Sequence, residues 1–260
     1  MMQLEELRRI AESVGEREGW DFSRIRDYTE PAPWDYMDVV RRYLHPSYHV
    51  LDVGTGGGEK FLELAPRFGT GIGIDIEPQM IEVAERNRSA AQVENVSFRP
   101  MRAEVLDFPD GTFDMALNRH SVVQVAEVVR VLKPGGLFIT QQVGGRNTQS
   151  IFTAFGWGSN GDFYRRVWEQ EGSAPQDTAS LADQFTALGH TTVARGEYDV
   201  RQYFLDVESL VFWLKAVPLP EDFDIERHWQ GVNRIIKDYG TDQGIETNEH
   251  RELLIARKQA

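Results

Sequence analysis

The stretch VLDVGTGGGEK, residues 50–60, decides the fold that we expect for this chain. It places four glycines within five positions, directly behind an apolar run that contains Asp52. Glycine loses more conformational freedom than any other residue when it is fixed in a helix or a strand. The cluster therefore predicts a turn whose backbone needs unusual dihedral angles or must leave room for a close neighbour.

Segments of alternating type surround this turn. Apolar runs predict strands, and segments with helical spacing predict helices. The expected strands are 49–54, 71–76, 96–101, 113–118 and 137–143, and the expected helices are 60–68, 78–90 and 125–132. Short strands that alternate with helices indicate a parallel sheet covered on both faces, with right-handed crossovers. We therefore expect an α/β fold of the Rossmann-like, doubly wound type.

The flanking segments have a different character. Further helices are expected at 2–18, 34–44, 181–189, 207–217 and 226–239, and further strands at 191–205 and 251–258, whereas 144–180 has no sustained period. Four parts are expected: an N-terminal helical segment (1–47), the core (48–143), a small helical and aromatic cap or insertion (144–180) and a C-terminal part that completes the sheet with inserted helices (181–260). The whole sheet is expected to be mostly parallel, with seven strands and an antiparallel last strand.

Composition narrows the classes of partner. The 260 residues carry 41 acidic and 28 basic side chains, a net charge of -13, which disfavours a nucleic-acid partner because phosphate backbones need clustered basic residues. There are no cysteines, so thiolate zinc sites and disulfides are excluded. The N-terminus MMQLEELRRI lacks the apolar stretch of a signal peptide, and no window resembles a membrane span. We expect a soluble, cytoplasmic protein with a small-molecule substrate; no oligomeric state is predicted.

Aromatic residues concentrate outside the core. All six tryptophans and all eight tyrosines lie outside residues 49–143. Such rings can line a small-molecule pocket under a lid, or they can simply pack the flanks against the sheet. The candidates for an aromatic lid are Trp20, Phe22, Tyr28, Trp34, Tyr36, Phe152, Phe155, Trp157, Phe163, Tyr164 and Trp168.

The glycine turn lies where a doubly wound sheet binds ligands, at the carboxyl end of its first strand. A dinucleotide fingerprint fits Gly54 and Gly56 but fails at Glu59, where a carboxylate would face the phosphates. No phosphate-binding P-loop is present either. Asp75 ends the second strand, where a carboxylate can accept hydrogen bonds from two ribose hydroxyls. A ligand with ribose and an amine but no phosphate fits this pattern, and S-adenosylmethionine is such a ligand.

Residues 48–143 resemble the class I S-adenosylmethionine-dependent methyltransferases, in the broad group that includes quinone-biosynthesis (type 11) enzymes. The similar motifs are VLDVGTGGGEKFLELA, GIDIEPQMIEVA, RAEVLDFPDGTFD and VLKPGGLFI, in that order. The resemblance implies methyl transfer to a small organic acceptor through an oxygen, nitrogen or carbon nucleophile. It also implies a cofactor site formed by Asp52, Gly54, Thr55, Gly56, Asp75, Ile76, Met80, Ala103, Glu104 and Asn118.

Two departures from the family pattern concern the adenine and the acceptor. Arg102 stands where many relatives have aspartate, so the adenine amino group would depend on Glu104 or on backbone. The connection after the fourth strand, NRHSVVQVAEV, is shorter than usual, which weakens any inference of the acceptor by analogy.

Residues after the fourth and fifth strands are candidates for the acceptor side. His120 is the candidate base, with the alternative that it only bonds its own turn. Gln141 and Gln142 point to opposite faces, so at most one faces a pocket. The substrate candidates are Arg119, Gln142, Trp34 and Tyr36. No metal is expected, since the strand ends LNRH and TQQVGG lack acidic ligands.

Three alternatives to a small-molecule methyltransferase stay open. An RNA methyltransferase would share the cofactor motifs, and so would a non-catalytic module that only binds S-adenosylmethionine. An oxidoreductase that uses NAD(P) is disfavoured by Glu59 and by the absence of a Tyr-x-x-x-Lys pair.

Overall fold

The computed structural model describes residues 1–17, 22–171, 176–217 and 223–260. The chain divides into two compact units, which we call the core unit and the second unit. The core unit comprises Trp34–Val143, Ala174–Glu197 and Glu252–Ala260. The second unit comprises Met1–Pro33, Gly144–Ser173 and Tyr198–Arg251.

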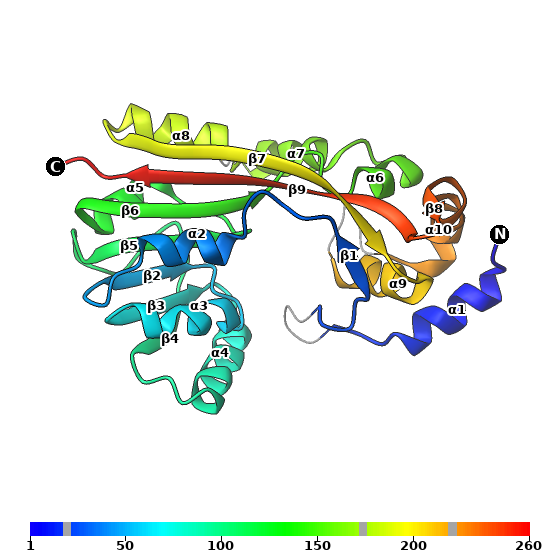
Figure 1. Ribbon diagram of the computed structural model, residues 1–260, viewed down its shortest axis with the longest axis horizontal. Coiled ribbons are helices and arrows are strands. Elements are labelled where there is room, and N and C mark those ends of the chain that lie inside the picture. Colours follow the sequence, from blue (N-terminus) through cyan, green and yellow to red (C-terminus); the bar gives the residue numbers. More distant parts are fainter. Residues whose placement is uncertain (18–21, 172–175, 218–222) are drawn as a thin grey trace. The chain divides into compact units, whose positions relative to one another are not determined.

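Five parallel strands form the centre of the core unit (Figure 1). They are β2 (His49–Val53), β3 (Thr70–Asp75), β4 (Val96–Pro100), β5 (Phe113–Arg119) and β6 (Leu132–Val143). Next to β6 lie β9 (Gly244–Arg257) and then β7 (Thr191–Phe204), which gives the order β7-β9-β6-β5-β2-β3-β4. This order, with the crossovers on both faces, confirms the doubly wound fold expected from the sequence.

The last strand runs against its neighbours. Hydrogen bonds join Gly135 to Lys258 and Gly144 to His250, so β9 is antiparallel to β6, as expected. The sheet has nine strands in the described residues rather than the expected seven. Seven strands do run through the core unit. The two further strands lie in the second unit, where β1 (Asp27–Thr29) pairs with β7 and β8 (Gly240–Thr241) pairs with β9.

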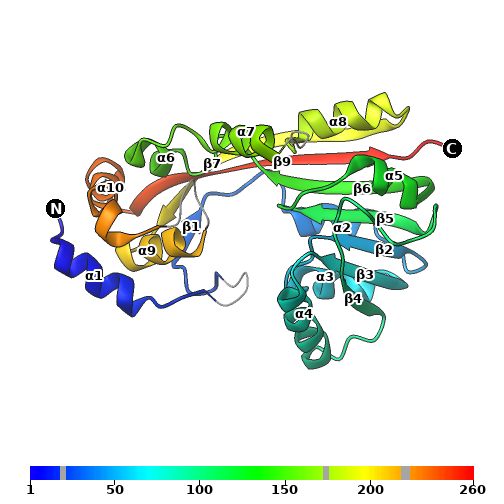
Figure 2. The same ribbon diagram turned by 180° about the vertical axis from the view of Figure 1, so that it is seen from behind.

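Two sets of helices cover the two faces of the core sheet (Figures 1 and 2). On one face lie α2 (Tyr36–Tyr43), α3 (Glu59–Leu64), its 3-10 extension η1 (Ala65–Arg67) and α4 (Pro78–Ala90). On the other lie α5 (Val125–Val131) and α8 (Thr178–Ala187). Because side chains alternate along a strand, Val50 packs in the first layer and Leu51 in the second.

The second unit has a hydrophobic core of its own. Helices α1 (Leu4–Ser13), α6 (Gln149–Phe155), α9 (Val207–Ala216) and α10 (Ile225–Tyr239) contribute buried residues to it, while α7 (Asn160–Glu171) adds partly buried Phe163. Residues 144–180, expected to be helical and aromatic but without a sustained period in the sequence, contain α6 and α7. Tertiary packing stabilises so short a helix as α6, whose sequence has too few turns for a clear period.

Several rings of the expected aromatic lid lie inside the second unit. Phe152 is fully buried, and the rings of Phe155 and Trp157 stack with centroids 4.3 Å apart. Trp20 and the side chain of Trp168 fall outside the described residues. Packing within their own unit thus accounts for these rings, and a lid over the substrate stays a prediction.

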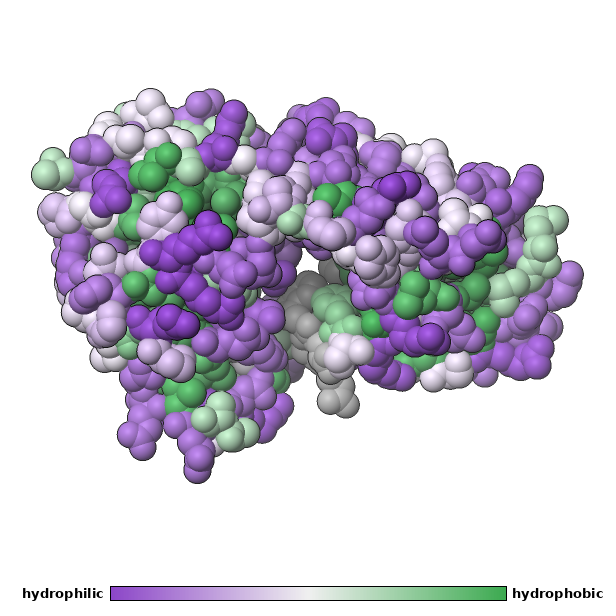
Figure 3. All heavy atoms as spheres, viewed as in Figure 1, coloured by the Kyte–Doolittle hydropathy of each residue, from purple (hydrophilic) through white to green (hydrophobic). Residues whose placement is uncertain are grey.

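The surface is mostly hydrophilic on the face shown in Figure 3, with small scattered apolar patches. Among the helices of the described ranges, none has the length and apolar character needed to cross a membrane.

Candidate functional site

The glycine turn links β2 to α3 through three left-handed residues. The φ angles of Gly54, Gly56 and Gly58 are +76°, +55° and +75°. The N–H groups of Gly54 and Thr55 both donate to the carbonyl of Ile74 in β3, each at 2.9 Å. The turn is therefore tied to the neighbouring strand and directed to the carboxyl edge of the sheet.

The protein itself fills the space beside two of these glycines. A Cβ on Gly54 would overlap both the Oγ and the Cβ of Ser121, which follows β5. A Cβ on Gly58 would lie 2.6 Å from the Phe98 ring. Glycine is thus required at these two positions by the fold, whereas Gly56 stays partly exposed. The sequence pattern alone could not separate these two causes.

Asp75 fastens the tip of the turn. One carboxylate oxygen accepts the Gly56 N–H at 2.8 Å, and the other accepts the Glu77 N–H at 3.0 Å. Each oxygen of an ionised carboxylate can accept a further hydrogen bond. The half-buried side chain therefore shapes the turn and keeps acceptor capacity for another group.

Asp52 lies beside this site with a perturbed acidity. The pKa of Asp52 is raised to about 6, chiefly by burial and also by the Asp75 charge, while the Thr55 hydroxyl and the Arg119 charge oppose the shift. Two carboxylates thus lie at the carboxyl ends of adjacent strands. Above the pKa of Asp52 this edge attracts a cationic ligand group.

The raised pKa of Asp52 gives a pH-dependent stability. The native state binds this proton more tightly than the unfolded chain, whose pKa is near 3.8, so stability falls as pH rises from about 4 to about 6. Asp52→Asn should therefore raise the free energy of unfolding by roughly 1–3 kcal/mol at about pH 8 and by little at about pH 4. Urea denaturation at both pH values measures this. An equal gain at both would mean that burial does not perturb Asp52.

Exposed apolar side chains follow the next two strands. Ile76, after β3, is 50% exposed, and Val105, after β4, is 70% exposed. Met80 and Ala103, two other candidates for the adenine side, are half-buried. Water-exposed apolar groups at the carboxyl ends of both strands suit a flat, apolar ring.

Glu104 is paired with the residue that departs from the family pattern. Its carboxylate lies 3.1 Å from Arg102, in an exposed ion pair. Such a pair adds little stability. It keeps the Glu104 charge partly compensated, so this carboxylate is not a lone anion beside the site.

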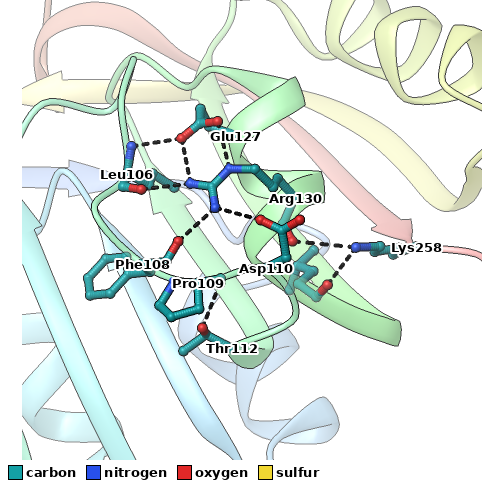
Figure 4. A network of polar contacts seen from close by, with 9 residues as sticks. Leu106, Phe108, Pro109, Asp110, Thr112, Glu127, Arg130 and Lys258 are labelled. Atoms are coloured by element: carbon teal, nitrogen blue, oxygen red, sulfur yellow. Dashed lines mark hydrogen bonds and ion pairs between the residues drawn. The ribbon is translucent and has the colours of Figure 1, made fainter.

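Arg130 in α5 fixes the segment that follows β4 (Figure 4). Its guanidinium donates to the carbonyls of Leu106 and Phe108 at 2.6 and 2.7 Å, and it pairs with Glu127 at 2.8 Å. Glu127 in turn accepts the Leu106 N–H at 2.8 Å, and the Arg130 hydrogen bond lowers the pKa of Glu127. In the sequence these two residues resemble an ordinary surface pair at i and i+3, so nothing local indicated this role.

Asn118 and Gln142 are committed to other protein groups. The Asn118 amide donates to the Val53 carbonyl at 3.0 Å, and its oxygen accepts from Thr140 and Gln142 at 2.9 and 2.7 Å. Gln142 also donates to the Ser121 carbonyl at 3.1 Å. These bonds join β2, β5 and β6, and direct ligand contacts by either residue stay predictions.

The opposite face of β6 brings together Trp34, Tyr36, Gln141 and His120. The Trp34 indole N–H donates to Gln141 Oε1 at 3.3 Å, and Gln141 Nε2 lies 3.4 Å from His120 Nε2. Buried Tyr36 donates to the Asn118 carbonyl at 3.1 Å, and burial raises its pKa. Gln141, which the sequence did not select as a substrate contact, thus lies with three candidates.

His120 adopts a strained backbone. Its φ is +57°, and its N–H donates to the Gln141 carbonyl at 2.9 Å. A left-handed non-glycine residue costs about 1–3 kcal/mol and concentrates at functional sites. Arg119 and His120 are both exposed, so the turn after β5 presents one permanent cation and one imidazole.

Comparisons with known proteins agree with this geometry. Residues 50–136 match the family model of a methyltransferase domain. The uncharacterized methyltransferase YcgJ of Bacillus subtilis is 38% identical over 99 residues, which are 35% of this chain and 39% of that protein. The demethylmenaquinone methyltransferase of Symbiobacterium thermophilum is 36% identical over 118 residues, which are 41% of this chain and 47% of that protein. The chain thus spans less than half the length of these relatives.

A solved structure supports the fold over most of the chain. The putative methyltransferase of Bacillus halodurans superimposes with a TM-score of 0.61 at 17% identity, covering 86% of this chain and 97% of that one. The segment that carries the glycine turn and Asp75 therefore matches a methyltransferase domain in sequence and in fold, as the resemblance to the class I S-adenosylmethionine-dependent family implied.

Proposed function

We propose that this chain binds S-adenosylmethionine at the carboxyl ends of β2, β3 and β4 and transfers its methyl group to a small organic acceptor. The observation that carries the proposal is the contact between Asp75 and Gly56. It places a carboxylate with unused acceptor capacity beside a partly exposed, left-handed glycine.

The chemistry of the available groups fits this cofactor. Asp75 offers oxygens to vicinal ribose hydroxyls, and the Asp52 carboxylate suits an ammonium group. Exposed Ile76 and Val105 suit the faces of a purine ring. A dinucleotide would instead bring phosphates toward two carboxylates and Glu59, which electrostatic repulsion disfavours.

The protein's main contribution to catalysis is placement. Bound S-adenosylmethionine supplies an electrophilic methyl group, so the chain needs chiefly to hold an acceptor in line with it. Trp34, Arg119 and His120 lie near the end of β5, beside the cofactor edge, and are proposed to hold the acceptor.

Two observations favour a small organic acceptor. The net charge of -13 opposes binding to a phosphate backbone. One of the relatives is a demethylmenaquinone methyltransferase by name, which supports a small acceptor for this chain as well.

Calorimetry separates this function from its alternatives. We expect S-adenosylmethionine and S-adenosylhomocysteine to bind with one site per chain, and NAD to give no binding heat. Incubation of a metabolite extract with methyl-labelled cofactor should then yield a labelled small molecule in the mass spectrum. Binding without any labelled product would indicate a non-catalytic module, and label in added RNA would indicate an RNA methyltransferase. NAD binding alone would overturn the cofactor assignment.

A further inference from the structure

The connection between β4 and β5 contains no helix or strand of its own. We call its residues 102–111 the β4–β5 loop; they consist of turns and irregular backbone. Leu106 and Phe108 bury their side chains in the layer that contains α5, whereas Val105 is 70% exposed. Because no regular ladder pairs its backbone, the loop depends on other groups for a fixed conformation.

Two residues of α5 supply those groups. Among the described residues, every hydrogen bond that joins the β4–β5 loop to another part of the chain ends on Glu127 or Arg130. Glu127 accepts the Leu106 N–H at 2.8 Å, and the Arg130 carbonyl accepts the Gly111 N–H at 3.0 Å. The conformation of the loop is therefore tied to one turn of one helix.

The Arg130 guanidinium uses all five of its N–H donors (Figure 4). They bind the carbonyls of Leu106 and Phe108 at 2.6 and 2.7 Å, Asp110 at 2.9 Å, and the two oxygens of Glu127 at 2.8 and 2.9 Å. A guanidinium holds its donors in one plane with fixed directions, whereas a lysine ammonium has three donors and no plane. Arg130 thus keeps no donor for a ligand, and any effect on a ligand must pass through the loop.

The other end of the loop adjoins the proposed ribose residue. The N–H of Met101, directly before the loop, donates to the Asp75 carbonyl at 2.8 Å. Ile76, directly after Asp75, is 50% exposed, like Val105 an apolar residue that follows a strand at the carboxyl edge. Val105 lies between the Met101 bond and the contacts with α5, so these two attachments determine its place.

We infer that Arg130 is a positioning residue for the cofactor, which with Glu127 holds the β4–β5 loop so that Val105 forms one side of the place where the adenine ring binds. This inference rests on the proposed function. Loss of Arg130 removes the guanidinium bonds to the loop and leaves several loop arrangements accessible. The apparent affinity for a ligand then falls in proportion to the fraction of molecules whose loop is in the binding arrangement.

Calorimetry with S-adenosylhomocysteine on the full chain measures this effect. We expect Arg130→Met to bind about ten-fold more weakly than the wild type, as when about one-tenth of the molecules hold the loop in place. Arg130→Lys keeps the charge and up to three donors, so an intermediate loss is expected. Asp110→Ala should bind as the wild type does, because Asp110 is 79% exposed and such a pair adds little. Wild-type affinity in Arg130→Met would overturn the inference.

Arg88 in α4 provides the matched control. Its side chain is also 31% exposed, it pairs with Glu85 three positions earlier at 2.8 Å, and it donates to the carbonyl of Val93 at 3.3 Å. Arg88→Met therefore removes similar contacts from the segment before β4 instead of the loop after it. We expect a loss of stability with unchanged affinity for S-adenosylhomocysteine. An equal loss of affinity in Arg88→Met and Arg130→Met would assign the effect to stability in general and contradict a positioning role.

A double variant keeps the test valid if Arg130→Met folds poorly. Removal of Arg130 alone leaves the Glu127 carboxylate, 21% exposed, without its cation, which adds to the instability. Glu127→Gln combined with Arg130→Met removes this charge and keeps an amide oxygen for the Leu106 N–H. We expect this variant to be more stable than Arg130→Met and to bind as weakly. Wild-type affinity in the double variant would show that the unpaired charge had weakened binding, which contradicts the inference.

Hydrogen exchange locates the effect within the chain. In the wild type, S-adenosylhomocysteine should slow amide exchange both in the glycine turn (50–60) and in residues 101–112. In Arg130→Met at saturating ligand, the turn should stay protected while residues 101–112 exchange faster. Faster exchange throughout the core unit would indicate general unfolding and would overturn the inference.

Failure of the proposed function is distinguishable from failure of this inference. A wild type that does not bind S-adenosylhomocysteine contradicts the proposed function. A wild type that binds it, together with an Arg130→Met variant that binds it equally well, contradicts only the positioning role of Arg130.

Discussion

Gly54→Ala is expected to abolish measurable S-adenosylmethionine binding and to lower the free energy of unfolding by roughly 2–5 kcal/mol. Part of this loss is backbone strain, because the φ of Gly54 is +76° and side chains disfavour that region. The rest is overlap with Ser121. Rotation of the Ser121 side chain would clear its Oγ but leave its Cβ in the way, so the turn after β2 or the turn after β5 must move.

Two variants separate the strain from the overlap. Gly189→Ala has a similar φ of +81° with no atom within 4 Å of the new Cβ, so it measures the cost of strain alone. Gly54→Ala with Ser121→Gly removes the overlap and should recover part of the stability and of the binding. Chemical denaturation and calorimetry with S-adenosylhomocysteine provide both quantities. If Gly54→Ala lost no more free energy of unfolding than Gly189→Ala and bound S-adenosylhomocysteine normally, overlap with Ser121 would not be the reason for glycine at position 54.

Asp75→Ala should weaken S-adenosylmethionine binding by roughly 1–3 kcal/mol, the cost of removing a charged acceptor from buried donors. Two effects combine in this loss. The ribose hydroxyls lose their proposed partner, and the N–H groups of Gly56 and Glu77 lose the carboxylate that now holds them. Asp75→Asn should recover at most part of the affinity, because its amide nitrogen would face one of these N–H donors.

Asp114 provides the matched control for Asp75. It lies at the amino end of β5, where its carboxylate accepts the His49 N–H at 2.8 Å and pairs with Lys133 at 2.8 Å. Asp114→Ala therefore removes a comparable set of contacts at the opposite edge of the sheet. We expect a loss of stability with unchanged affinity for S-adenosylhomocysteine. Unchanged affinity in folded Asp75→Ala would instead remove Asp75 from the ribose site.

The sequence determined the parallel centre of the core unit, and it located the glycine turn and Asp75, on which the proposed cofactor site depends. Alternating apolar runs and helical spacing are local signals, and they located β2 to β6 within one or two residues at most ends, although β6 begins earlier, at Leu132. The local sequence also predicts the glycine turn and the place of Asp75, because both stand directly at the end of an expected strand. It does not predict which residues they contact, since Ser121 lies far along the chain from Gly54.

Only the tertiary structure decided the second unit and the contacts of the residues proposed for the acceptor side. Helix α6 is too short to show a clear helical period in the sequence. Its apolar residues are buried because α10 packs against them in the folded second unit. Gln141 and Gln142 are chemically alike, and their roles differ because they face opposite sides of β6. Trp34 reaches Gln141 across 107 positions of the chain. The local sequence cannot predict a contact at that separation. Strand order and register bring Trp34 and Gln141 together.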